Sequence, residues 1–121
     1  MRIRTLMTTL AMAAMLGGAP ALADSHSGIY TAKDLLSPCQ EADNDARWGA
    51  AAEAECEQYI LGFVGALEVT GAVSLCLPEQ NLADEARWAF MRWVHASYSE
   101  RTAMPASAVL LEMLVETFAC E

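Results

Sequence analysis

The chain has 121 residues, of which sixteen are acidic and seven basic, and its formal net charge is −9. A chain this acidic is expected to bind neither nucleic acid nor an anionic membrane, because both repel it. The charge favours a basic protein partner, or it serves solubility alone.

The first 23 residues have the pattern of a secretory signal peptide. Arg2 and Arg4 precede an apolar run over residues 6–16, and Ala21-Leu22-Ala23 is an A-x-A cleavage site. Cleavage there removes two of the seven basic residues and none of the acidic ones, which leaves residues 24–121 as one domain with net charge −11. No later apolar run reaches the ~20 residues that span a bilayer. We therefore expect a periplasmic product with no membrane contact.

A short first helix is expected to begin at Thr31, because Asp34 three residues later completes a sequence close to a capping box. Pro38 should stop this helix or lie in its last turn, since proline lacks the N–H that a helix interior needs. Residues 41–45 then read as a polar, acidic loop.

The segment 46–70 predicts a long helix rich in alanine. Its apolar residues recur at steps of three and four and so share one face. They are Cys56, Tyr59, Ile60, Phe63 and Leu67. Gly62 and Gly65 interrupt this helix at a cost of ~1 kcal/mol each, which suggests that another helix approaches closely there. Gly71 is a suitable terminator.

A third helix is expected from Asn81, with Asp84 in its first turn, to about Ser97. It carries two apolar stripes rather than one. The first contains Leu82, Ala86, Ala89, Phe90 and Trp93, and the second contains Trp88, Met91, His95 and Tyr98. Either the helix is central to the bundle, or one stripe contacts a partner.

A last helix is expected from Pro105, a residue that suits a first helical turn. Its buried face is expected to contain Leu110, Leu111, Leu114, Val115 and Phe118. No window alternates with period two, so strands are not predicted. The fold class is therefore all-α, a small disulfide-stapled bundle of about four helices.

Four cysteines in an exported chain indicate two disulfides. Four cysteines allow three pairings. If the last two long helices form a hairpin, Cys76 before one and Cys120 after the other become neighbours, and Cys39 then pairs with Cys56. We favour this pairing over the other two, which stay open at this point.

The sequence predicts no catalytic residues, no metal and no cofactor. The cysteine spacings of 17, 20 and 44 lack the close pairs typical of zinc sites. The histidines, His26 and His95, belong to no recognisable catalytic motif, and neither a nucleophile elbow nor a phosphate loop is present. We therefore expect a binding protein and not an enzyme.

Four sequence elements together resemble one family. They are T-A-K-D-L-L before Cys39, C-E-Q-Y-I-L-G from Cys56, C-L-P from Cys76, and F-A-C ending at Cys120. This order resembles the Rap/Tai family, the immunity proteins against amidase effectors of type VI secretion. One departure is Ala119, where that family often has proline.

The resemblance implies an all-helical periplasmic domain, often a homodimer, that binds a peptidoglycan amidase and blocks its active-site cleft. Contact residues do not follow from the motifs. From expected exposure we predict two contact segments, the acidic loop and the connection 99–104. The predicted partner-binding residues are Glu41, Asp43, Asp45, Ser99, Glu100 and Arg101.

A second class of function also suits the sequence. Acid-stress chaperones of the HdeA type are small, helical, disulfide-bonded and exported, and they depend on carboxylates that become neutral at low pH. Four cysteines match that class less well than they match the immunity family.

Overall fold

Five helices make up the domain in the computed structural model, which describes residues 28–121. The predicted signal peptide, residues 1–23, lies outside the described residues. The helices are α1 (Ala32–Asn44), α2 (Gly49–Thr70), α3 (Leu82–Ala96), α4 (Tyr98–Arg101) and α5 (Ala106–Phe118). The all-α prediction is confirmed, and the one-turn helix α4 adds to the four expected.

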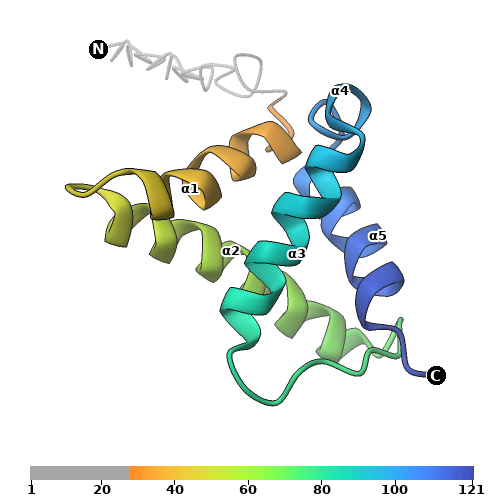
Figure 1. Ribbon diagram of the computed structural model, residues 1–121. Coiled ribbons are helices and arrows are strands. Elements are labelled where there is room, and N and C mark those ends of the chain that lie inside the picture. Colours follow the sequence, from red (N-terminus) through yellow and green to blue (C-terminus); the bar gives the residue numbers. More distant parts are fainter. Residues whose placement is uncertain (1–27) are drawn as a thin grey trace, which may run out of the picture.

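Helices α1 and α2 form an antiparallel hairpin, and α3 and α5 pack across it (Figure 1). Extended pairing within residues 28–121 is limited to two isolated bridges, Thr31 with Pro105 and Leu75 with Ala119. None of the helices in this part of the chain is both long and apolar enough to cross a membrane.

The start of α1 has the predicted capping box. The Thr31 hydroxyl accepts a hydrogen bond from the Asp34 amide at 3.3 Å, and the Thr31 amide donates to the Asp34 carboxylate at 2.9 Å. The Thr31 hydroxyl also donates to the Asp34 carboxylate at 2.8 Å. The hydrogen bonds that this carboxylate accepts from the Thr31 amide and hydroxyl lower the pKa of Asp34. The amide of Ala32 also donates to the carbonyl of Met104 at 2.8 Å. The first turn of α1 is thereby fixed to the segment between α4 and α5.

The predictions that α1 ends near Pro38 and that residues 41–45 form a loop were wrong. The helix continues through Pro38 to Asn44, so Glu41 and Asp43 are helical. Pro38 has no N–H to donate to the carbonyl of Asp34 four residues earlier. The hydroxyl of Tyr30 donates to that carbonyl instead, at 3.2 Å. This substitute hydrogen bond explains how a buried proline fits inside the helix.

The close approach predicted at Gly62 and Gly65 was also wrong. A Cβ atom at either position would meet nothing within 4 Å. The glycine at a close approach is Gly49, where a Cβ would lie 2.8 Å from the carbonyl oxygen of Ala42 at the turn of the α1–α2 hairpin. Gly71 ends α2 with φ of 62°, as the sequence predicts.

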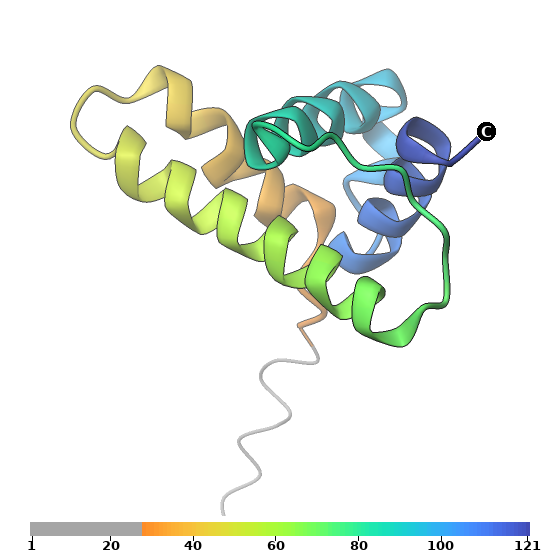
Figure 2. The same cartoon turned by 90° about the horizontal axis from the view of Figure 1, so that it is seen from below.

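The disulfides join Cys39 to Cys56 and Cys76 to Cys120, which is the pairing that the sequence favours. Cys39 and Cys56 are fully buried and tie α1 to α2, whereas Cys76 and Cys120 are exposed. Figure 2 shows the connection from α2 to α3 running past the end of α5. There the amide of Cys76 donates to the carbonyl of Phe118 at 2.7 Å.

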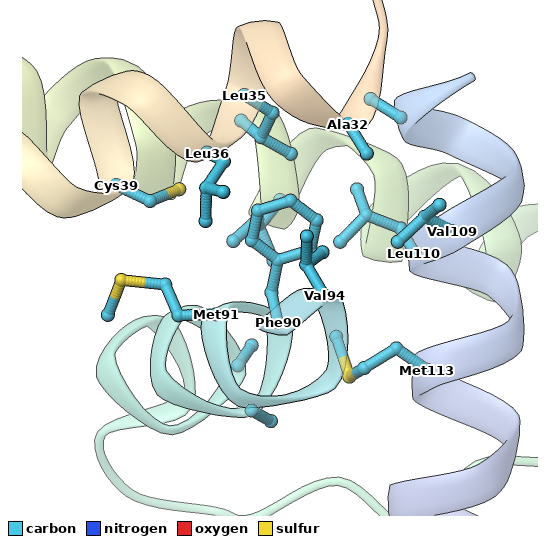
Figure 3. Close-up of a cluster of buried hydrophobic side chains, with 14 of the residues drawn as sticks. Ala32, Leu35, Leu36, Cys39, Phe90, Met91, Val94, Val109, Leu110 and Met113 are labelled. Atoms are coloured by element: carbon cyan, nitrogen blue, oxygen red, sulfur yellow. The ribbon is translucent and has the colours of Figure 1, made fainter. Parts of the chain in front are cut away.

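The core lies where α1, α2, α3 and α5 meet. Phe90 extends from α3 to the centre of this cluster, between side chains of α1 and α5 (Figure 3). Its labelled neighbours in that view include Leu35, Leu36, Val109, Leu110 and Met113, all of them buried. This packing buries Ala86, Ala89 and Phe90 of the first apolar stripe of α3, while Leu82 and Trp93 are partly buried. On α5, the prediction that Leu111 and Val115 lie on the buried face was wrong, because their side chains are 37% and 42% exposed.

Candidate functional site

The second apolar stripe of α3 reaches the surface. Met91 is buried, but Trp88 is 45% exposed, Tyr98 is 46% exposed, and His95 is exposed. Of the two interpretations made from the sequence, the one with a stripe free for a partner therefore agrees better with the structure. Large aromatic side chains on a surface are typical of protein contact sites.

This stripe and the second half of α1 enclose a surface hollow of about 380 Å³, called the α1–α3 groove below. Its lining combines an apolar and aromatic floor with polar side chains. The lining residues are Gln40, Asp43, Asn44, Trp88, Met91, Arg92 and His95. Gln40 and His95 share a hydrogen bond of 2.7 Å between their side-chain nitrogens. The His95 ring also stacks on Tyr98 with 5.6 Å between centroids.

Arg87 lies beneath one end of the groove and is 4% exposed. Its guanidinium donates to the carboxylate of Asp43 at 2.9 Å and to the carbonyl of Cys39 at 3.2 Å. The same group lies 5.1 Å from the centre of the Trp88 ring, within the range of a cation–π contact. Arg87 therefore fixes Trp88 relative to α1 and to the buried disulfide.

Two further carboxylates lie near Arg87. Glu57 of α2 and Asp84 of α3 each approach the guanidinium to 3.7 Å. Oxygens of Glu53, Glu57 and Asp84 lie within 4.8 Å of one another. Burial raises the pKa of Glu57 to about 7, helped by a hydrogen bond with Asp84 and by repulsion from Glu53 and Asp84; Arg87 acts in the opposite direction.

The three carboxylates have the donor type for a metal ion, but Arg87 already supplies a positive charge beside two of them. A second cation there would be repelled by this buried guanidinium. Protonation of Glu57 reduces the repulsion among the three carboxylates and places no second cation next to Arg87. The arrangement suits a structural cluster that titrates near neutral pH.

The predicted contact residues on the first segment lie in different surroundings. Glu41 is exposed, and Asp43 lines the groove while it binds Arg87. Asp45 accepts hydrogen bonds from the amides of Arg47 and Trp48 at 2.8 and 2.9 Å. Asp45 thus shapes the α1–α2 turn.

The second predicted segment, residues 99–104, is helical in its first half, where it belongs to α4. Ser99 and Glu100 are exposed. Arg101 lies with its guanidinium 3.3 Å from the centre of the Trp93 ring and donates to the Trp93 carbonyl. Arg101 therefore contributes to the packing of α4 on α3. Tyr98, the first residue of α4, lines a second surface hollow together with Glu41 and Asn44.

Comparison with protein-family models shows that residues 31–120 match the model described as Rap1a immunity proteins. The chain belongs to the Rap1a immunity family. The matched region contains both disulfides and every helix of the described domain. Neither the curated proteins nor the solved structures include a significant match to the chain.

Membership of the Rap1a family makes the protein an immunity protein, whose role is to bind a partner effector. Such a protein inhibits by binding and requires no catalytic group of its own. Parts of the family's sequence pattern have clear structural roles here. Thr31 and Asp34 form the cap of α1, and Tyr59 packs on Tyr30 with 5.0 Å between ring centroids.

Asp43 was predicted from the sequence as a contact residue, whereas Gln40, Arg87 and Arg92 of this Rap1a family member were not assigned to any site. The second stripe of α3 was the available signal, because it contains Trp88 and His95. The stripe alone did not indicate that the exposed side of α1 forms the other wall of the groove.

Proposed function

We propose that the protein is a periplasmic immunity protein that neutralises a peptidoglycan amidase effector of type VI secretion by blocking its active-site cleft. The observation that carries this proposal is the family match over residues 31–120. The four motif elements around the cysteines, which resemble the Rap/Tai pattern, support the amidase as the target.

The domain has two properties that suit an inhibitor of this kind. Its two disulfides and buried core hold the α1–α3 groove in a fixed shape, so little conformational freedom is lost on binding. Residues 28–121 contain fifteen acidic and five basic side chains. This charge would speed association with a basic, cell-wall-binding enzyme.

The experiment is a growth-rescue test in a bacterium that expresses a peptidoglycan amidase effector directed to its periplasm. Co-expression of the full chain should restore growth, whereas a version lacking residues 1–23 should not. The second arm tests the proposed signal peptide and periplasmic site of action. Absence of rescue by the full chain, with the protein present in the periplasm, would refute the amidase as target.

Inhibition should also be measured with purified proteins as release of peptides from peptidoglycan. Association is expected to slow as salt rises, because screening weakens the attraction between opposite charges. Rapid, salt-independent association would contradict the electrostatic part of the proposal. Light scattering of the free protein tests the homodimer that the resemblance implies.

A further inference from the structure

The indole of Trp88 has the features of an anchor for a partner. It is large, 45% exposed and held against Arg87, which is itself fixed by Asp43 and the carbonyl of Cys39. A rigid aromatic side chain loses little freedom when it is covered, and tryptophan is enriched among residues that dominate binding energy. The groove beside it has room for a side chain of the partner, at about 380 Å³.

The charges around Trp88 are unevenly distributed. Asp84 and Glu85 lie one helical turn before it in α3, and Asp43 lies across the groove. Arg87 forms ion pairs with Asp43 and Asp84, and Glu53 and Glu57 add two further carboxylates near Asp84. Arg92 lies one turn after Trp88, toward His95. The groove therefore has an excess of negative charge at one end only.

We propose that the α1–α3 groove is the surface that docks the effector, and that it receives a protruding segment in which a lysine or arginine is next to an apolar side chain. The cation faces Asp84, Glu85 and Asp43, and the apolar side chain covers Trp88 and Met91. The polar pair Gln40 and His95 bounds the apolar part. This inference builds on the proposed immunity function and adds the chemistry of the contact.

The groove can be tested without knowing the effector, using a phage library of random disulfide-constrained heptapeptides selected against the purified, oxidised protein. Selected peptides should combine Lys or Arg with a neighbouring Leu, Phe or Tyr. Their affinity should fall at least tenfold for Trp88→Ala and change less than twofold for Trp48→Ala. Trp48 is a matched control, because it is 62% exposed and does not line the groove.

The charge requirement is tested with a second matched pair. Glu85→Lys and Glu112→Lys change the net charge equally, but Glu112 lies on the exposed side of α5. Peptide affinity should fall about tenfold for Glu85→Lys and stay nearly unchanged for Glu112→Lys. Equal losses would mean that overall charge, and not the groove, attracts the peptides. Acidic peptides, or no enrichment over selection on Trp88→Ala, would overturn the proposal.

The same variants separate this inference from the proposed function. If the wild-type protein inhibits an amidase and Trp88→Ala inhibits it equally well, the groove proposal fails and the immunity proposal stands. If the wild-type protein inhibits no amidase, the proposed target fails, and the peptide selection still decides the groove. Thermal unfolding of each variant confirms that a loss of binding does not arise from unfolding.

Discussion

The guanidinium of Arg87 donates to the carboxylate of Asp43 at 2.9 Å and so joins α3 to the last turn of α1. The same arginine donates to the carbonyl of Cys39, whose sulfur is bonded to Cys56 in α2. One side chain thus connects three helices beneath the groove. Its loss should affect both the stability of the domain and the position of Trp88.

Replacement of Arg87 by Met should lower the free energy of unfolding by about 2 kcal/mol, because it leaves a buried carbonyl and partly buried carboxylates without their partner. Urea denaturation measures this change. Arg92→Met is the control, since Arg92 is exposed and should cost less than ~0.5 kcal/mol. Equal effects of the two substitutions would show that the buried contacts of Arg87 contribute little.

Stability should depend on pH through Glu57. Burial raises its pKa in the folded protein to about 7, above the unfolded value of 4.5. The folded state therefore binds the proton more tightly, so this contribution is fully present below pH 4.5 and is lost as pH rises through 7. Urea midpoints should decline between pH 5 and pH 8 for the wild-type protein.

The variant Glu57→Gln should flatten this decline, because a neutral amide replaces the group that titrates. Glu68→Gln is a matched control on the exposed side of the same helix and should retain the wild-type pH dependence. A profile that Glu57→Gln leaves unchanged would rule out Glu57 as its source. The direction of this pH dependence also bears on the acid-stress chaperone interpretation, because protonation of Glu57 stabilises the folded protein on mild acidification.

Removal of the Tyr30 hydroxyl should destabilise α1. Tyr30→Phe leaves the Asp34 carbonyl without the hydrogen bond that replaces the missing N–H of Pro38. A loss of about 1 kcal/mol is expected for one unmade hydrogen bond. Tyr98→Phe is the control, and calorimetric melting of both variants provides the comparison. A second variant, Tyr30→Phe with Pro38→Ala, should recover stability because the helix regains its own donor.

Local signals in the sequence predicted much of this fold. The Thr31 cap and Gly71 depend on residues within one or two turns, and the disulfide pairing follows once a hairpin of α3 and α5 is assumed. Pro38 misled the prediction because its compensating donor, Tyr30, precedes the helix. Arg87 could not be identified, since its partners Cys39, Asp43 and Glu57 come from two helices, α1 and α2, that are distant from it in sequence.

The two disulfides should be reduced in a defined order. Cys76 and Cys120 are exposed, whereas Cys39 and Cys56 are fully buried, so a thiol reagent reaches the first pair sooner. Reduction with increasing dithiothreitol, followed by alkylation and mass spectrometry, should yield a species with only Cys76 and Cys120 labelled. Labelling of all four cysteines in one step would instead indicate that reduction requires global unfolding.

Gly49 and Gly62 provide a final pair with opposite expectations. Gly49→Ala places a Cβ 2.8 Å from the carbonyl oxygen of Ala42, and the backbone of the α1–α2 hairpin must shift to accept it. A loss of about 1–3 kcal/mol is expected, as for other overpacked sites.

Gly62→Ala meets nothing within 4 Å and replaces a glycine in the middle of α2. It should stabilise the domain by about 0.5–1 kcal/mol through higher helix propensity. Urea denaturation of both variants measures the difference in sign. If Gly62→Ala stabilises the domain and leaves inhibition of the proposed amidase target intact, this face of α2 is free in the complex. If inhibition is lost in a more stable protein, the partner contacts α2 at Gly62.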